Sequence, residues 1–427
     1  MTSPSRTRRA PAVGRELRTA ARSRFGRNVA TTAVANLVST GTAGVTGIVI
    51  ARTLGPAGRG EYAAIVTWFG VILVVGELGQ TAATTYFVAR EPRRAPAYLA
   101  TARTVMLASG SVVLVLGIIL APLLAPGDSE MVRGYRLMFA ACVASFIAAS
   151  YIFSLQAVHI EHWNVARVAQ PAGFLLAVVL LDLAGHLGLM STLAALVGTI
   201  VAQTALAWWL CGRHRLTGGR PELALASPLT RYGAGQLAAS VPGVVTGRLD
   251  QLVLSVAVAP ALLGHYAVAT SLAALAVPLA SALGSVAFPR IAADSLSTHT
   301  VGRLQWRAVG ASAAVAVVVM LPLAGLAPWL VPRVFGADYR QAVGLVELLA
   351  PGGVLLAVGQ VCGDLLRGHN QPYAVARAQA VAAAVTVLLL ATLVPHIGVA
   401  GAAVASSVAA AVALVLMLRA LARIGTL

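Results

Sequence analysis

The sequence predicts an all-α membrane protein with twelve transmembrane helices, in two six-helix lobes related by a pseudo-two-fold axis along the membrane normal. Three observations carry this prediction: an apolar composition, the spacing of the apolar runs and an internal repeat. Of the 427 residues, 58% are hydrophobic and only 11% are charged, whereas soluble domains carry about 25% charged residues. Such a chain lacks the polar groups to cover a soluble catalytic domain, so we expect no enzyme activity and no cofactor.

Apolar runs of about 20 residues, long enough to cross a bilayer as α-helices, recur along the whole chain. Between them lie short polar or Gly/Pro-rich segments, which mark the loops. The short alternating segments of a membrane β-barrel are absent from the sequence. The expected spans are residues 29–51, 62–89, 104–125, 134–157, 165–184, 189–211, 232–258, 262–288, 308–331, 341–366, 373–394 and 398–418.

The arginines indicate the orientation, because cytoplasmic loops carry the excess of basic residues. All 31 basic residues are Arg, against 14 acidic residues. With a cytoplasmic N-terminus, 24 arginines fall in inside segments, 6 in outside loops, and Arg248 in a span. We therefore expect a multi-pass protein of the bacterial cytoplasmic membrane with both termini cytoplasmic. The basic excess faces anionic lipid, and no nucleic acid is expected as a partner.

The chain repeats itself at a near-constant offset. Gly60-Glu-Tyr62-Ala recurs as Gly264-His-Tyr266-Ala, and Tyr135-Arg recurs as Tyr339-Arg, both 204 positions later. Further on, at an offset of 210, Val-Ala-Arg167 matches Val-Ala-Arg377, with His159 opposite His369. Two parallel halves of six crossings are a transporter architecture. The expected division is a basic, disordered cytoplasmic tail (1–28), an N-terminal lobe (29–212), a cytoplasmic linker (213–231) and a C-terminal lobe (232–427).

Charged residues inside spans are candidates for function because they are costly in the bilayer. The seventh span contains Arg248, Asp250 and Gln251. Arg248 and Asp250 cannot share one face of a regular helix, so either they face different neighbours or the helix is irregular, for which Val241-Pro242-Gly243 is a plausible cause. We expect Arg248 to be a cavity cation and Asp250 its partner or a protonatable group; the alternative is a structural ion pair between helices.

The second span carries a polar stripe. Glu77, Gln80, Thr81 and Thr84 recur at helical i, i+3, i+4 and i+7 spacing, and such a stripe is costly against lipid. We expect it to line the central cavity, or alternatively to form interhelix hydrogen bonds. A carboxyl group at such a site makes proton coupling at Glu77 a hypothesis.

Further polar groups are weaker candidates. Asp364 is a third candidate for ion coupling besides Glu77 and Asp250, although Arg367 at i+3 favours a local pair. Arg52 and Arg59 flank the first outer loop, where they hold a turn or touch an anionic head group. His159, Glu161 and His162 lack the spacing of a zinc protease, and no Cys/His ligand spacing occurs, so we expect solvated loop residues, no metal site and no catalytic residues.

Several segments resemble the polysaccharide flippases of the multidrug/oligosaccharidyl-lipid/polysaccharide exporter superfamily. Ala51-Arg-Thr-Leu-Gly-Pro-Ala-Gly-Arg-Gly-Glu-Tyr62-Ala is similar to the first-loop signature of that family. Glu77-Leu-Gly79 and Arg248-Leu-Asp250-Gln-Leu resemble patterns of its second and seventh helices. Phe335-Gly-Ala-Asp-Tyr339 and Ile397-Gly-Val-Ala-Gly401 resemble those of its ninth loop and twelfth helix. The resemblance covers nearly the whole chain.

The resemblance implies a transporter that moves polyprenyl-diphosphate-linked oligosaccharide across the cytoplasmic membrane by alternating access, for surface or exopolysaccharide biosynthesis. Its partners would be membrane lipid, the lipid-linked glycan and a polysaccharide polymerase or glycosyltransferases. Arg248 suits a diphosphate because Arg binds phosphate oxygens bidentately. Two alternatives stay open: a cation-coupled multidrug antiporter of the same fold, and a non-transporting membrane scaffold for polysaccharide assembly.

Overall fold

The computed structural model describes residues 12–281 and 298–425, and its regular elements there are helices, which confirms the expected all-α class. In the first part of the chain these are α1 (Ala12–Gly76), α2 (Gln80–Arg90), η1 (Pro92–Arg94), α3 (Ala95–Leu124), α4 (Ser129–Val158), α5 (Ile160–Leu183) and α6 (Leu189–Arg213). The later part has α7 (Leu223–Thr246), α8 (Leu249–Ala257), α9 (Pro260–Ala273), α11 (Thr298–Phe335), η2 (Ala337–Gln341), α12 (Ala342–Gly368) and α13 (Pro372–Gly425).

Nine helices within the described residues are long and apolar enough to cross a membrane. Two of them are bent at a glycine outside helical geometry: α1 at Gly55 (φ 66°) and α13 at Gly398 (φ 57°). Each bend falls in or beside a segment that the sequence marks as a short connection between two spans. A positive φ suits glycine, which has no Cβ.

Three expected boundaries were wrong. The first outer loop at 52–61 is a bend inside α1, so Arg52 and Arg59 lie on helical turns. The tail at 1–28 is helical from Ala12, because its Arg, Ala, Leu and Glu residues are good helix formers. The linker at 213–231 is shorter than expected, since α7 begins at Leu223. The expected span 262–288 ends outside the described residues.

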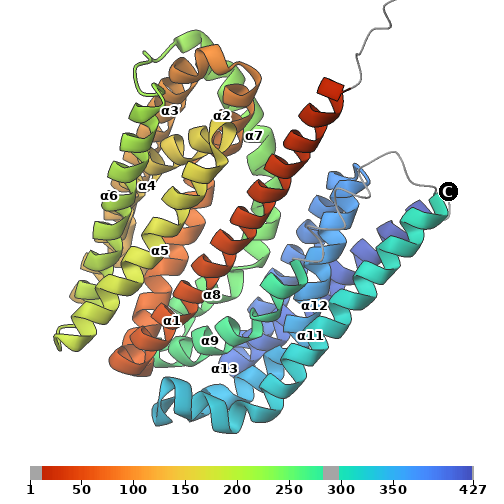
Figure 1. Ribbon diagram of the computed structural model, residues 1–427. Coiled ribbons are helices and arrows are strands. Elements are labelled where there is room, and N and C mark those ends of the chain that lie inside the picture. Colours follow the sequence, from red (N-terminus) through yellow and green to blue (C-terminus); the bar gives the residue numbers. More distant parts are fainter. Residues whose placement is uncertain (1–11, 282–297, 426–427) are drawn as a thin grey trace, which may run out of the picture.

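Each arm of α1 has its own partner helix. In the first arm, Arg27 forms an ion pair with Glu161 at the start of α5, at 3.1 Å. At the other end of that arm, Thr53 donates a hydrogen bond to Asp182 at the end of α5, at 2.6 Å. The second arm instead contacts α4 through Ile65, α8 through Thr67 and Trp68, and α9 through Gly60. The chain reverses direction at the bend (Figure 1).

The repeated segments meet across the molecule. A Cβ on Gly60 would lie 1.7 Å from the carbonyl oxygen of Pro260, and one on Gly264 would lie 1.9 Å from the carbonyl oxygen of Pro56. Pro56 and Gly60 stand 204 positions before Pro260 and Gly264, so the contact is reciprocal. Equivalent residues that touch each other's partners are typical of a two-fold relation. The backbones of α1 and α9 can approach this closely only because both positions lack a side chain.

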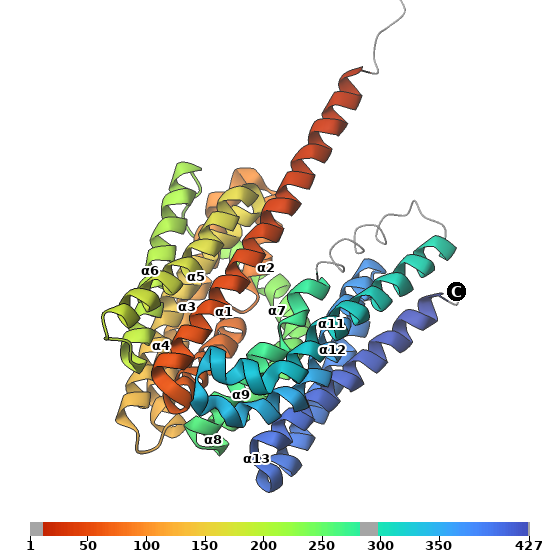
Figure 2. The same ribbon diagram turned by 60° about the horizontal axis from the view of Figure 1, so that its bottom comes forward.

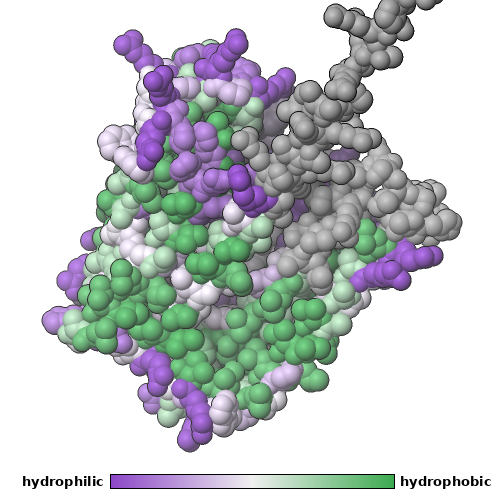
Figure 3. All heavy atoms as spheres, in the orientation of Figure 1, coloured by the Kyte–Doolittle hydropathy of each residue, from purple (hydrophilic) through white to green (hydrophobic). Residues whose placement is uncertain are grey.

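The views in Figures 1 and 2 place α2–α6 on one side of the molecule and α11–α13 on the other, with α7, α8 and α9 between them. On the face drawn in Figure 3, apolar side chains form a broad zone between two polar ends. Large apolar residues are exposed along this kind of surface, among them Leu116, Ile119 and Leu123 of α3, which are 51%, 62% and 73% exposed. Such surface is stable against lipid rather than water.

Candidate functional site

The second expected span is broken rather than continuous. The chain leaves helical geometry at Glu77, Leu78 and Gly79, where Leu78 has φ 52° and Gly79 φ 66°. The break packs on α7: a Cβ on Gly79 would lie 2.1 Å from the carbonyl oxygen of Gly233. A non-glycine residue with positive φ is uncommon and points to a site that its surroundings hold in place. Glu77 therefore sits in a turn between α1 and α2, and the expected stripe on one regular helix is wrong at its first member.

The remaining members of that stripe lie in α2 and are buried. Gln80 and Thr84 are 0% exposed and Thr81 is 8% exposed. The Thr81 hydroxyl donates to Glu77 Oε1 at 3.0 Å. Within the described residues, the Gln80 amide and the Thr84 hydroxyl have no hydrogen-bond partner. Buried polar groups without partners are rare, so this break concentrates polar groups that no neighbouring side chain satisfies.

The seventh expected span is also broken, between α7 and α8. The break falls at Gly247 and Arg248, with Arg248 preceding α8 at φ −136° and ψ −10°, while α7 stays helical through Pro242 and Gly243. The irregular helix that the spacing of Arg248 and Asp250 suggested is thus present, although one turn later than Pro242 indicated. Arg248 is exposed.

Asp250 is not the ion-pair partner of Arg248, which corrects that expectation. The Asp250 carboxylate is 7% exposed. It accepts hydrogen bonds from the Tyr266 hydroxyl at 2.5 Å and the Ser406 hydroxyl at 2.8 Å. It also accepts one from the backbone N–H of Gln251 at 2.7 Å. These bonds join α8, α9 and α13, and no ion pair to Arg248 is found among the residues described.

Gln251 connects the two parts of the chain. Its Oε1 accepts a hydrogen bond from Thr67 of α1 at 2.9 Å, and its Nε2 donates to Thr270 of α9 at 3.2 Å. One turn further along α8, Ser255 accepts a bond from Trp68 Nε1 at 3.0 Å. Gln251 is therefore engaged in interhelix hydrogen bonds on both sides.

An unusual surface lies along α7, and we name it the α7 stripe. Its members are exposed and small or polar: Gly235, Gln236, Ser240, Gly243 and Gly247. Most follow the i, i+4, i+7, i+11 spacing of a single helix face. A Cβ on Gly235 or Gly243 would meet nothing within 4 Å, so the space beside them is open.

The large apolar side chains of α7 are mostly buried or half-buried. Among its described residues, only Leu223 at the first turn is a large apolar residue that is exposed. A helix that faced lipid would expose such residues, as α3 does. The α7 stripe is consequently suited to water or a polar ligand, and Arg248 stands at its end.

The other expected site residues lie elsewhere. Arg59 is half-buried and stacks on the Tyr62 ring with its guanidinium carbon 5.5 Å from the ring centroid, while Arg52 is exposed beside the α1 bend. Asp364 forms the expected local pair with Arg367 at 2.8 Å. None of these three shares a hydrogen bond or ion pair with Arg248 or Glu77 in the described part of the chain.

The structure adds Thr67, Tyr266 and Ser406, which sequence reasoning did not select. Tyr266 had a signal, because it repeats Tyr62 at the offset of 204. Ser406 is 156 residues from Asp250, in a run of Ala, Val and Ser that carries no distinguishing pattern.

The fold defines the class of protein. The structure is similar to an inward-facing multidrug resistance MATE family transporter of the MOP superfamily, with a TM-score of 0.75 and 14% identity over 90% of this chain and 95% of that one. It is also similar to the lipid II flippase MurJ in an inward closed conformation, with a TM-score of 0.77 and 12% identity over 91% of this chain and 87% of that one. These similarities establish the fold of MOP superfamily membrane transporters.

The sequence then places the chain within that class. Residues 25–295 match the polysaccharide biosynthesis protein family, and the chain belongs to this family of polysaccharide flippases. A curated relative is the probable low-salt glycan biosynthesis flippase Agl15 of Haloferax volcanii, 22% identical over 214 residues. The match covers 50% of this chain and 44% of that protein's length. The expected multi-pass membrane protein of the polysaccharide flippase family is thus confirmed.

Proposed function

We propose that this protein moves a lipid-linked oligosaccharide, carried on a polyprenyl diphosphate, across the membrane by alternating access. Its family membership supports a glycan-related cargo. The single observation that carries the proposal is the exposed, polar α7 stripe ending at Arg248, a cation with no acidic partner among the described residues. A guanidinium that is not held in an ion pair is suited to bind diphosphate oxygens bidentately. The lipid tail would remain in the bilayer while the head group passes along the stripe.

We further propose twelve crossings in two six-helix lobes related by a pseudo-two-fold axis, with the second lobe beginning at α7. The bends of α1 and α13 at glycines support dividing each into two crossings. The reciprocal contact of Gly60 and Gly264 supports the symmetry. The distribution of arginines supports cytoplasmic termini in a bacterial plasma membrane. The cargo would then travel from the cytoplasmic to the outer leaflet.

Glu77 is the acid that we propose for proton coupling. Asp250 receives three hydrogen bonds and Asp364 is paired, so neither carboxylate is available. Glu77 is half-buried and accepts a hydrogen bond from the Thr81 hydroxyl. It lies in a backbone break beside polar groups that have no partner among the described residues. Glu77→Gln should abolish any dependence of transport on a proton gradient, and unchanged proton-driven transport in that variant would exclude this role.

The test of the cargo uses the full chain in proteoliposomes and fluorescent polyprenyl-diphosphate-linked sugars. Arg248→Ala should weaken binding of the diphosphate lipid by about 10- to 150-fold, since a hydrogen bond to a charged group contributes about 1.5–3 kcal/mol. Binding of the matching uncharged polyprenol should not change. Arg340→Ala, which removes another exposed arginine far along the chain in η2, is the control.

Equal binding of the diphosphate lipid by the Arg248→Ala and Arg340→Ala proteins would contradict the assignment of Arg248. Preference for an organic cation over the diphosphate lipid would instead favour a multidrug antiporter. Binding without any movement between leaflets would favour the scaffold.

A further inference from the structure

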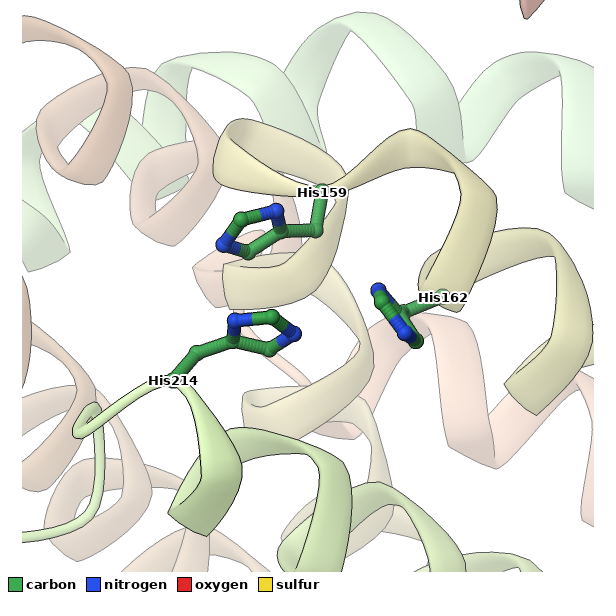
Figure 4. A group of neighbouring side chains, drawn as sticks. All are labelled: His159, His162 and His214. Carbon is green, nitrogen blue, oxygen red and sulfur yellow. The ribbon is translucent and has the colours of Figure 1, made fainter.

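Three histidines meet at one end of the first half of the chain, away from the residues considered above. His159 lies between α4 and α5, His162 in the first turn of α5, and His214 directly after α6. Figure 4 shows the rings of His159 and His214 stacked face to face, with His162 beside them. The centroids of the stacked pair are 3.6 Å apart, and that of His162 lies 4.8 Å from His214. One ring nitrogen from each residue can be chosen so that all three lie within 4.8 Å of one another.

The ring nitrogens of this cluster, which we call the three-histidine cluster, are unsatisfied. Across residues 12–281 and 298–425, the structure has no side chain or backbone group hydrogen-bonded to any of the six nitrogens. All three residues are half-buried, so their imidazoles are accessible without being fully hydrated. Nitrogen lone pairs that converge without donors are the arrangement that a metal ion completes.

The repeat of the chain provides an internal comparison. His369 stands opposite His159 at the offset of 210, at the equivalent junction before α13. Its Nε2 is within hydrogen-bond distance of Gln305 Oε1, at 2.9 Å. The second copy of the junction therefore satisfies its histidine with an amide, whereas the first copy gathers two further histidines. The cluster is specific to the first half and is not a requirement of the fold.

We propose that the three-histidine cluster binds a zinc-class divalent transition-metal ion through His159, His162 and His214. Zn–N bonds are about 2.0–2.1 Å, so ligand nitrogens of a tetrahedral site are about 3.4 Å apart. Closing the present separations requires movements of about 1.5 Å and rotation of one stacked ring toward the others. Three imidazoles leave one coordination position for water.

The surroundings favour the ligating form of the rings. Burial lowers the pKa of His159 and of His214, and the neighbouring imidazoles lower both further. Neutral imidazole is the form that binds metal. The nearby Arg213 guanidinium adds to the lowering at His214 and stacks on Trp209. Glu161 is held by Arg27 in an ion pair, so the ligand set is nitrogen only, which suits zinc rather than magnesium or calcium.

A bound ion would join the α4–α5 junction to the end of α6. These helices are otherwise connected at this end by the packing of apolar residues such as Tyr151, whose carbonyl oxygen accepts from the Cys211 thiol at 3.5 Å. The metal would thus hold one end of the first half rigid. This role is independent of cargo, because none of the three histidines lies on the α7 stripe.

The test is isothermal titration of Zn²⁺ into the purified full chain in detergent, with an affinity tag that contains no histidine. We expect one ion per chain and a rise of the melting temperature on binding. His162→Ala and His214→Ala should each weaken Zn²⁺ binding by at least about tenfold. Even residues that only hydrogen-bond to a metal ligand typically cost about 10- to 100-fold in affinity when they are removed. His396→Ala, which removes an exposed histidine of α13, should bind as the unaltered chain does.

Absence of one-to-one binding, or equal affinity of the His214→Ala and His396→Ala proteins, would overturn the proposal. Where a variant is poorly folded, the visible absorption of Co²⁺ bound to the unaltered chain decides instead. A tetrahedral spectrum supports the site, and an octahedral, solvent-like spectrum overturns it. Failure here leaves the lipid-binding result for Arg248 untouched, so the two proposals can fail separately.

Discussion

A single added methyl group at the crossing of α1 and α9, in the variant Gly60→Ala, should force these two helices apart. In Gly60→Ala, the new Cβ would lie 1.7 Å from the Pro260 carbonyl oxygen and 2.9 Å from the backbone nitrogen of Gly264. Ordinary contacts between such atoms are about 3.5 Å, so the two helices must separate by about 1.5–2 Å. Both close neighbours are backbone atoms, which cannot rotate out of the way.

The free-energy cost of the Gly60→Ala substitution follows from known overpacking effects. Overpacking a well-packed contact costs about 1–3 kcal/mol. If the protein has two conformations, the same energy shifts the equilibrium between them by about 5- to 150-fold, toward the conformation in which α1 and α9 are separated. Thr67 of α1 donates to Gln251 of α8 at 2.9 Å, and Gln251 in turn donates to Thr270 of α9. Separation of α1 from α9 should break this chain of hydrogen bonds, and Thr67, now 2% exposed, would become accessible.

Maleimide labelling of Thr67→Cys measures this opening. The native cysteines give little background because Cys142, Cys211 and Cys362 are all buried. We expect the labelling rate to rise about 5- to 150-fold when Gly60→Ala is added. Gly41→Ala in the first arm of α1 is the matched control, since a Cβ there would meet nothing within 4 Å. Equal labelling in the two backgrounds, with both proteins monodisperse, would refute the reasoning.

Three further predictions concern polar groups. Tyr266→Phe should lower the melting temperature, because the buried Asp250 carboxylate loses a donor at 2.5 Å, at a cost of about 1–3 kcal/mol; an unchanged melting curve would contradict this. Thr84→Val should preserve or raise the melting temperature, since the buried Thr84 hydroxyl has no partner among the described residues. Thr81→Val should lower the melting temperature, because it removes the hydrogen bond to Glu77. A lower melting temperature for Thr84→Val than for Thr81→Val would contradict this interpretation of the two hydroxyls. Burial, and then the charges of the neighbouring imidazoles, lower the pKa of His214 below its ordinary value of 6.5. As pH falls, the unfolded chain therefore binds a proton at this residue before the folded chain does, and the free energy of unfolding should decrease from about pH 7 downward. Melting curves taken across this pH range should show a smaller decrease for His214→Ala.

Much of the fold was predictable because membrane insertion imposes simple rules on sequence. A helix in lipid must be apolar over about 20 residues, so α4, α5 and α6 begin and end near the expected spans, whereas α3 begins at Ala95, well before its expected start at 104. The same rules do not locate breaks. Leu78 with its positive φ and Arg248 before α8 lie inside apolar runs, and their backbone geometry depends on neighbours such as Gly233 in a distant helix.

The candidate site divides in the same way. Arg248 was identified because a charge in an apolar span is costly, and this needs no knowledge of its neighbours. The partners of Asp250 were not identifiable, because Tyr266 and Ser406 are 16 and 156 residues away and an apolar helix pattern does not say which neighbour each face meets. The three-histidine cluster was missed for the same reason, since His214 joins His159 and His162 only through packing.

The sequence by itself determined that this protein is an all-helical membrane protein of a polysaccharide flippase family, since hydropathy and family motifs are local properties of the chain. Only the tertiary structure decided that Asp250 accepts hydrogen bonds from Tyr266, Ser406 and Gln251, while Arg248, at the end of the α7 stripe, forms no ion pair within the described residues. The physical reason is that a charge's availability depends on which donors and carboxylates surround it in space, and those come from helices far apart in the chain.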